Sequence, residues 1–271
     1  MSVNSKMTAI ADAIRGKTGG TDTLSLDAMA AAIEGISAGG GTTAEDSLVT
    51  RLITECANNR VTSIGDYAFC SCKQLTSVSF PQVTSIGDYA FYYCTTLSSV
   101  DFPQVTSIGD YAFNVCEDIE SVSFPLATSI GVQGLSNCDM LRSVDLPKVT
   151  TINNSAFKGN IYLENVFIPQ ATSINKSAFY QCSHLVRLDL PKVTNIAAEA
   201  FRFSDLGCLI LRSETICTLA NVNALSGTDI ASGTGSIYVP DALVEDYKAA
   251  TNWVTYADQI KPLSEYVEVS E

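Results

Sequence analysis

The apolar and polar positions of this chain follow a repeat of 22 residues over its middle part. Counted from the first residue of each unit, apolar or small side chains fill positions 1, 4, 8, 9, 15, 18 and 20 in at least six units. The units begin, without one insertion, at Val61, Val83, Val105, Ala127, Val149, Ala171 and Val193. One such unit is too small to bury its own apolar face. The pattern therefore predicts a solenoid whose stacked units share a continuous core.

The last third of each unit predicts one short strand, because positions 17 to 20 alternate in character. Positions 18 and 20 are expected to face the core, and positions 17 and 19 the solvent. Pro at position 21 of six units ends the strand, since proline has no backbone N–H to donate. Position 5 is Gly or Asn in six units, which we interpret as a backbone site with positive φ. Positions 6 to 11 are expected to form a turn or a short helix.

Position 12 forms a column that is rich in cysteine. Its residues are Cys72, Cys94, Cys116, Cys138, Asn160, Cys182 and Ser204. Asn and Ser cannot replace a thiolate ligand, and a structural zinc site needs four ligands. We therefore interpret the column as small residues whose polar tips meet the backbone, and we expect no metal site. Nine Cys in all is an odd count that does not indicate a disulfide framework.

The residues before the repeats follow a different pattern. In residues 1–36, apolar side chains recur at helical spacing in two segments, which predicts a small helical hairpin that acts as an anchor. Such a hairpin is too small to be stable alone, so it is expected to dock on a partner or to self-associate. Residues 37–43 are expected to be a Gly-rich flexible linker. Residues 44–60 are expected to be an N-terminal cap that covers the first unit.

The seven units cover residues 61–214, after which the period breaks. Residues 215–240 are interpreted as a degenerate eighth repeat, in which three extra residues separate Leu225 from the strand residue Val239. Residues 241–271 are expected to form a C-terminal helical cap and tail. Asp241 is a suitable N-cap for that helix, and Trp253 is expected to close the end of the core.

The repeated string that starts at Val61, Val-Thr-Ser-Ile-Gly-Asp-Tyr-Ala-Phe-x-x-Cys-x-x-Leu-x-Ser-Val-x-Phe-Pro, resembles the BspA-type leucine-rich repeat. The resemblance covers residues 61–214. It implies an α/β solenoid, a right-handed superhelix with a parallel β ladder on its concave side, to which the chain adds the N-terminal helical hairpin and the C-terminal capping helix. It also implies recognition or adhesion through a protein or a glycan rather than catalysis.

The N-terminal segment carries a second resemblance. Residues 7–20, followed by residues 26–33, are similar to short N-terminal segments of tail-associated proteins of phages and prophages. This similarity implies that residues 1–36 join a particle while the repeats act as a receptor-binding surface for a cell-surface protein or glycan. The alternative is a BspA-type bacterial surface adhesin or protein-interaction protein.

Composition and charge narrow the function classes. The net charge of −13 argues against a nucleic-acid partner, because no cationic stripe is available to meet phosphates. With a single His, we expect no catalytic residues, no metal and no cofactor. No apolar run reaches the ~18 residues of a membrane span. The pattern of a secretory signal is absent from the N-terminus. The expected location is a virion or tail particle, or a bacterial cell surface reached by another export route.

The outward strand positions are the expected ligand-binding surface. Their second half places Phe167 near Arg187, a combination typical of binding hot spots, although a merely solvated sheet is the alternative. The candidates on this face are Asp101, Asp145, Asn165, Phe167, Arg187, Asp189 and Leu211. Positions 10 and 11 vary between similar units, and tyrosine is favoured in binding surfaces, so these columns add the candidates Tyr92, Tyr93 and Tyr180. His184 stands in a variable, solvent-facing column and is not expected to be catalytic.

Overall fold

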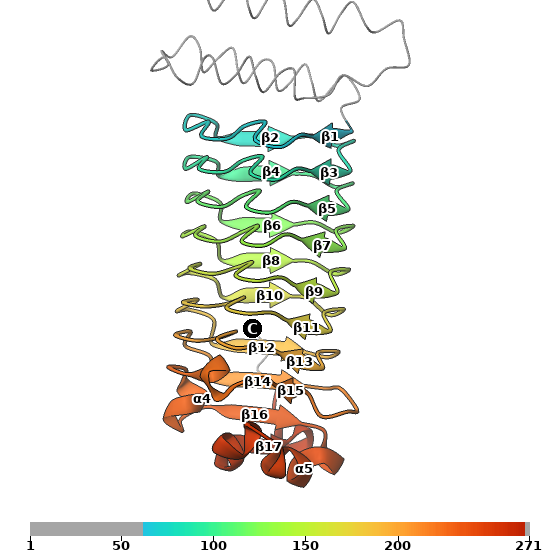
Figure 1. Ribbon diagram of the computed structural model, residues 1–271, viewed down its shortest axis with the longest axis vertical. Helices are drawn as coiled ribbons and strands as arrows, with labels where there is room; N and C mark the ends of the chain where they lie inside the picture. Colours follow the sequence, from blue (N-terminus) through green and yellow to red (C-terminus); the bar gives the residue numbers. More distant parts are fainter. Residues whose placement is uncertain (1–61, 269–271) are drawn as a thin grey trace, which may run out of the picture.

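The protein is an elongated solenoid of stacked units in the computed structural model, which describes residues 62–268 (Figure 1). The predictions for residues 1–36, 37–43 and 44–60, and the end of the C-terminal tail at 269–271, lie outside the described residues. Below, each unit is a rung, rung 1 begins at Val61, and position numbers are kept. Within residues 62–268, every helix is too short or too polar to cross a lipid bilayer.

Each rung contributes two short strands, one more than the sequence predicts. The additional strand occupies positions 3 and 4 and pairs in parallel with the same positions of the next rung. Position 4 is buried in every rung, which anchors this minor ladder to the core. Its strands form one sheet in chain order: β1 Ser63–Ile64, β3 Ser85–Ile86, β5 Ser107–Ile108, β7 Ser129–Ile130, β9 Thr151–Ile152, β11 Ser173–Ile174, β13 Asn195–Ile196 and β15 Thr218–Leu219.

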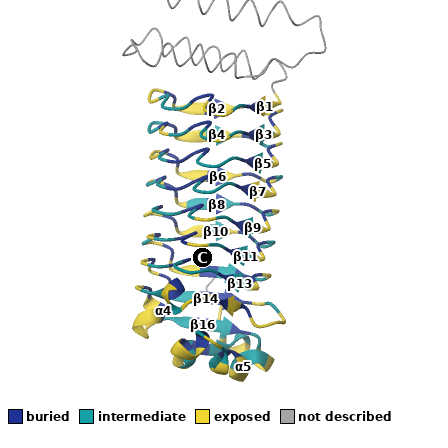
Figure 2. Cartoon of the chain, in the orientation of Figure 1, coloured by how far each residue is buried: buried dark blue, intermediate teal, exposed yellow. Residues whose placement is uncertain are grey.

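The predicted strand near positions 17 to 19 is present in every rung and forms the main ladder, which is also parallel. In the first six rungs position 18 faces the core and positions 17 and 19 face outward, as predicted (Figure 2). The strands form three sheets: β2-β4, β6-β8-β10 and β12-β14-β16-β17. Their bounds are β2 Ser77–Ser79, β4 Ser99–Asp101, β6 Ser121–Ser123, β8 Ser143–Asp145, β10 Asn165–Phe167, β12 Arg187–Leu190, β14 Cys208–Leu211, β16 Ser236–Val239 and β17 Ile260–Pro262.

Aromatic rings stack along the core from rung to rung. At position 9, the rings of Phe69, Phe91 and Phe113 follow one another with centroids 5.0 Å apart in both steps. A second stack joins Phe179 to Phe157 at 5.2 Å and to Phe201 at 5.6 Å. All of these rings are buried. Because each ring packs on its neighbour, the stability of one rung depends on the rungs beside it.

The structural interpretation of the cysteine column is confirmed. The thiol of Cys94 donates a hydrogen bond to the carbonyl of Phe69 in the preceding rung, with sulfur and oxygen 2.9 Å apart. Asn160 makes the equivalent bond from its side-chain amide to the carbonyl of Leu135, also at 2.9 Å. Burial raises the pKa of the Cys138 thiol to about 12, so it stays protonated and can donate. The same bond is made by Cys116, Cys138 and Cys182. All eight described cysteines are free.

The interpretation of position 5 as a site with positive φ is wrong. Gly87, Gly109 and Gly131 do not adopt positive φ. Positive φ occurs instead at positions 7 and 11 of all seven rungs, as in Tyr67 at 58° and Ser71 at 59°. Backbone N–H groups of this turn donate to carbonyls of the next rung; the Tyr67 bond is 2.9 Å long. The turn therefore joins successive rungs by hydrogen bonds, as the strands do.

The glycines at position 5 make room for an aspartate of the preceding rung. The Asp66 carboxylate accepts the backbone N–H of Asp88 at 2.8 Å, and the Asp88 carboxylate accepts that of Asp110 at 2.7 Å. A Cβ placed on Gly109 would lie 2.5 Å from Asp88 Oδ1 and 2.6 Å from the carbonyl carbon of Gly87. Other residues replace Gly where the preceding rung lacks this aspartate, namely Asn153, Asn175 and Ala197.

Gly109→Ala is expected to lower the free energy of unfolding by about 1–3 kcal/mol, because the added methyl group overlaps the preceding rung. When Asp88→Val is added, the methyl group no longer meets the carboxylate. The loss in the double variant is therefore expected to be smaller than the sum of the two single losses. Urea denaturation of the three variants measures this difference, and additive losses would show that the two residues are not coupled.

The seventh rung is one residue shorter before its main strand, and this overturns the predicted orientation of Leu211. Arg187 pairs with Cys208 and Leu190 with Leu211, a spacing of 21 rather than 22 residues. Leu206 is buried, so the core leucine that stands at position 15 in earlier rungs also comes one residue earlier here. Since side chains alternate along a strand, this shift turns Leu211 from the solvent face to the core. Leu211 is fully buried and is therefore not a ligand-binding residue.

The C-terminal end of the solenoid is closed by rung 8 and a helical cap (Figure 1). In rung 8, the residues between β15 and β16 form η1 Val222–Leu225 and α4 Asp229–Ser232, and α4 occupies the stretch with extra residues. The cap contains η2 Asp241–Leu243, α5 Val244–Ala249, η3 Trp253–Gln259, β17 and η4 Leu263–Glu265.

Side chains of the cap form hydrogen bonds with backbone groups at the open edge of the minor ladder, at β15. The Trp253 indole N–H donates to the carbonyl of Cys217 at 2.6 Å, and the Tyr247 hydroxyl accepts the N–H of Cys217 at 2.7 Å. The side-chain amide of Asn252 donates to the carbonyl of Leu219 at 2.7 Å. An unpaired strand edge is a template for association, so these bonds protect the end of the ladder.

Asp241 does not cap the C-terminal helix as predicted. The 3-10 helix η2 begins at Asp241 and leads directly into α5, which has no side-chain cap. The Asp241 carboxylate instead accepts the backbone N–H of Ser264 at 3.0 Å. Hydrogen bonds from Ser264 hold the pKa of Asp241 below its usual range. Asp241 thus ties the residues after β17 to the cap.

Candidate ligand-binding groove

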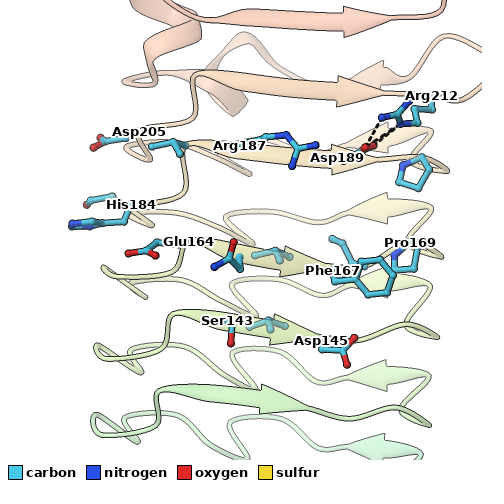
Figure 3. A pocket seen from close by; sticks show the side chains of 17 residues that line it. Ser143, Asp145, Glu164, Phe167, Pro169, His184, Arg187, Asp189, Asp205 and Arg212 are labelled. Atoms are coloured by element: carbon cyan, nitrogen blue, oxygen red, sulfur yellow. Dashed lines mark hydrogen bonds and ion pairs between the residues drawn. The ribbon is translucent and has the colours of Figure 1, made fainter. Parts of the chain in front are cut away.

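An open groove of about 1010 Å³ lies on the solvent face of the main ladder, over β8, β10 and β12 (Figure 3). It spans the place where the ladder is interrupted, between β10 and β12. We call it the groove, and it is lined by Ser143, Val144, Asp145, Glu164, Asn165, Val166, Phe167, Ile168, Pro169, Ser183, His184, Val186, Arg187, Asp189, Pro191, Asp205 and Arg212.

Phe167 is the most prominent apolar residue of the groove. It stands at position 19 of β10, in register with Asp145 of β8, and 56% of its surface is exposed. The same position holds Ser or Asp in the other rungs of the regular ladder. The fold therefore does not require an aromatic side chain here, which favours a role in binding.

The groove that holds Phe167 is also lined by four carboxylates, and two of them are held in ion pairs. The Nε and Nη2 atoms of Arg212 donate hydrogen bonds of 2.8 to 3.0 Å to the carboxylate oxygens of Asp189, drawn as dashed lines in Figure 3. The hydrogen bonds that Arg212 donates to the Asp189 carboxylate raise the pKa of Arg212 above its usual value. Glu164 pairs with Arg142 at 3.3 Å.

Arg187 differs from these arginines because it forms no ion pair within residues 62–268. Its guanidinium carbon lies 5.5 Å from the ring centroid of Tyr266, in the C-terminal tail. A cation facing an aromatic ring is attracted by the ring, but its charge is not neutralised. Among the described residues, Arg187 is therefore the cation of the groove that is free to meet an anionic group of a ligand.

The groove brings together five of the seven residues predicted on this face. Asp145, Asn165, Phe167, Arg187 and Asp189 all line it. Asp101 lies on the same face but outside the groove, where its carboxylate accepts the hydroxyl of Ser79 at 2.8 Å. Leu211 lies in the core, as described above.

Several other groove residues were not predicted from the sequence, among them Glu164, His184 and Asp205. Glu164 and Asp205 precede the strands, in loops whose path the repeat pattern does not specify. His184 is exposed, as expected, but lines the groove, and its Nδ1 lies 2.9 Å from the carbonyl oxygen of Ile161. The variability of its column was the available signal, because variable outward positions mark either unimportant or ligand-specific residues.

The candidate tyrosines of positions 10 and 11 are not among the residues that line the groove. The ring of Tyr93 is exposed and lies 6.0 Å from that of Tyr92, with the Lys73 ammonium 4.6 Å from its centroid. Tyr180 packs edge-on against Phe203 at 5.6 Å. A binding role for these tyrosines stays a prediction for a separate surface.

Metal chemistry has no support in the described part of the chain. Within residues 62–268, no group of three His, Cys, Asp or Glu side chains is arranged to hold a metal ion. The column cysteines are buried hydrogen-bond donors rather than thiolates, because burial raises their pKa values.

Comparison with known proteins identifies the repeats. Two overlapping stretches, residues 51–163 and 106–231, match the family described as BspA type leucine rich repeat region (6 copies). Together they span more than half of the 271 residues. The chain belongs to the BspA-type leucine-rich repeat family. Leucine-rich repeat proteins are generally non-enzymatic and bind other proteins. The match begins at residue 51, so it does not bear on the resemblance of residues 1–36 to phage tail-associated proteins.

A solved structure agrees with this family. A leucine-rich repeat protein from Bacteroides ovatus is 25% identical with a TM-score of 0.53, and the match covers 67% of this chain and 53% of that one. A T. pallidum leucine-rich repeat protein is 26% identical with a TM-score of 0.48, covering 53% of this chain and 70% of that one. This BspA-type chain thus spans about half the length of the Bacteroides ovatus protein. No curated protein matches it.

Proposed function

We propose that the groove recognises a protein on a cell surface, so that the chain acts as a non-enzymatic adhesion or interaction module. The observation that carries this proposal is Phe167, an exposed aromatic ring that shares an open groove with Arg187, which forms no ion pair among the described residues. Buried aromatic and arginine side chains contribute most of the binding energy at many protein interfaces. The ion pairs of Asp189 and Glu164 also favour recognition over acid–base catalysis.

Phe167→Ala is expected to weaken binding of the full chain to its target cells at least about tenfold, because central aromatic anchors are worth more than about 1 kcal/mol. Binding of the labelled protein to a panel of bacterial cells, measured by flow cytometry, tests this. Phe203→Ala is the matched control, since Phe203 is 43% exposed and lies outside the groove. Equal binding by the two variants would show that the groove is not the site.

The chemistry of the target is tested on the same cells. Protease treatment of the cells is expected to abolish binding if the ligand is a protein. Periodate treatment, which oxidises sugars, is expected to leave it unchanged. The opposite result would replace the protein with a glycan as the ligand.

We further propose that residues 1–36 attach this module to a phage or prophage tail particle, so that the groove serves as a receptor-binding surface on the virion. The support is the similarity of residues 7–33 to segments of tail-associated proteins. Co-sedimentation with tail particles should require residues 1–43, whereas cell binding should not. If residues 1–43 prove dispensable for co-sedimentation, the bacterial surface adhesin, exported by another route, is favoured instead.

A further inference from the structure

After β17 the chain turns back over the main ladder. The C-terminal tail, defined here as Leu263–Glu268, begins with η4 and is held at Ser264 by the Asp241 carboxylate. The backbone of Tyr266 is extended, with φ −74° and ψ 123°. The ring of Tyr266 lies edge-on to Tyr238 of β16, with centroids 5.1 Å apart, and also faces Arg187 of β12. Because β14 lies between β16 and β12, the tail crosses the strands toward the groove.

The tail covers the cationic end of the groove. Tyr266 faces the guanidinium of Arg187, and the charge of Glu268 adds to that of Asp189 in raising the pKa of Arg212. Both arginines line the groove. The aromatic ring of Tyr266 thus occupies the place where a ligand would meet Arg187.

The tail is held by few contacts. The hydroxyl of Tyr266 is buried and has no hydrogen-bond partner among the described residues, and a buried unpaired hydroxyl disfavours the docked state. Val267 is 78% exposed and makes little apolar contact. A ligand that pairs with the arginines can therefore displace the tail at a small cost in free energy.

We propose that the groove binds an extended peptide segment of its protein partner that places an aromatic side chain on Arg187, and that the tail is a built-in competitor for this place. The proposal rests on the proposed function of the groove and names the chemistry of the partner. The groove also carries Asp145 on β8 and Asp205 in the loop before β14, so the segment is uncharged or basic where it meets these carboxylates (Figure 3). The tail, tethered to the same chain, competes at high effective concentration.

The test uses a fluorescent peptide with the sequence of residues 263–271 and the full-length chain. Tyr266→Ala is expected to bind this peptide at least about 5-fold tighter than the unchanged protein, because apparent affinity scales with the fraction of open grooves. Tyr266→Phe is expected to act in the opposite direction, since it removes the unpaired hydroxyl and strengthens the docked tail. Adding Arg187→Gln to Tyr266→Ala should abolish the gain. Fluorescence anisotropy measures the affinities of the unchanged protein and the three variants, and thermal unfolding verifies that each variant is folded.

Phe203→Ala is the matched control, because Phe203 faces Arg202 at 4.7 Å in the same kind of contact but lies outside both the tail and the groove. Equal peptide affinity for Tyr266→Ala and the unchanged protein would overturn the proposal, as would binding that survives Arg187→Gln. These failures are distinct from failure of the proposed function. Loss of cell binding in Phe167→Ala would support the groove as the cell-binding site even if the peptide result were negative. Unchanged cell binding would reject only that role and would leave the peptide result to decide whether the tail competes for the groove.

Discussion

Phe113→Ala is expected to lower the free energy of unfolding by about 3–5 kcal/mol, the loss usual for a large buried aromatic side chain. Phe113 is fully buried, and its ring lies 5.0 Å from that of Phe91 in the preceding rung. It also contacts the rings of Phe102 at 6.2 Å and Phe124 at 5.9 Å. Truncation leaves a cavity that touches neighbours in more than one rung, and a repeated backbone has little freedom to collapse around it.

Urea denaturation followed by circular dichroism measures this loss. In a solenoid, stability depends on contacts between adjacent rungs, so a cavity in rung 3 is also expected to weaken the coupling between the two halves. A broadened or two-step transition is the expected sign. Phe203→Ala, at an exposed position, should change stability by less than about 1 kcal/mol. A similar loss in both variants would contradict the importance of the ring stack.

Trp253→Ala is expected to lower the free energy of unfolding by about 3–5 kcal/mol, because it opens the C-terminal end of the core. Trp253 packs edge-on against Tyr247 at 5.5 Å and donates the hydrogen bond that satisfies the carbonyl of Cys217. Without the indole N–H, the carbonyl of Cys217 at the edge of β15 loses its hydrogen-bond donor. Exposed strand edges associate, so the variant should also form oligomers at high concentration.

Thermal unfolding and light scattering measure the two effects of Trp253→Ala. Trp253→Phe keeps most of the apolar volume but not the N–H, so it should lose only about 1–3 kcal/mol, the penalty of one unpaired buried carbonyl. Val254→Ala is the control for the same segment, since Val254 is exposed. A Trp253→Ala variant that stays monomeric and as stable as the control would show that the cap does not protect the ladder.

The repeat pattern predicts a large part of the fold, because stacked units can share one core only if the same positions of every unit face inward. Positions 18 and 20 had to face inward for stacked units to share a core, and the main ladder follows from that. The minor ladder was not predicted, since two residues such as Ser63 and Ile64 are too short to show an alternation. With the exception of Gly159, the positive φ values of positions 7 and 11 fall on residues other than Gly, because hydrogen bonds between rungs hold the turn.

The candidate site was predictable only where the strict period holds. Asp145, Phe167 and Arg187 were found because they occupy outward positions of regular strands. Leu211 was misplaced because the deletion before β14 leaves no trace in an apolar segment whose residues suit either face. Arg212 and Tyr266 could not be found, since the first depends on this register shift and the second on the direction of the tail after β17.

The direction of the bonds between rungs has a mechanical consequence. The strands lie across the long axis of the solenoid, so the hydrogen bonds that join them run along it (Figure 1). Tension along that axis therefore loads one interface at a time, as in opening a zipper, rather than many bonds in parallel. Each rung that opens releases about 70–80 Å of extended chain. Under a pull from its C-terminus, the chain would first shed the tail and uncover Arg187, and would then lengthen stepwise at low force.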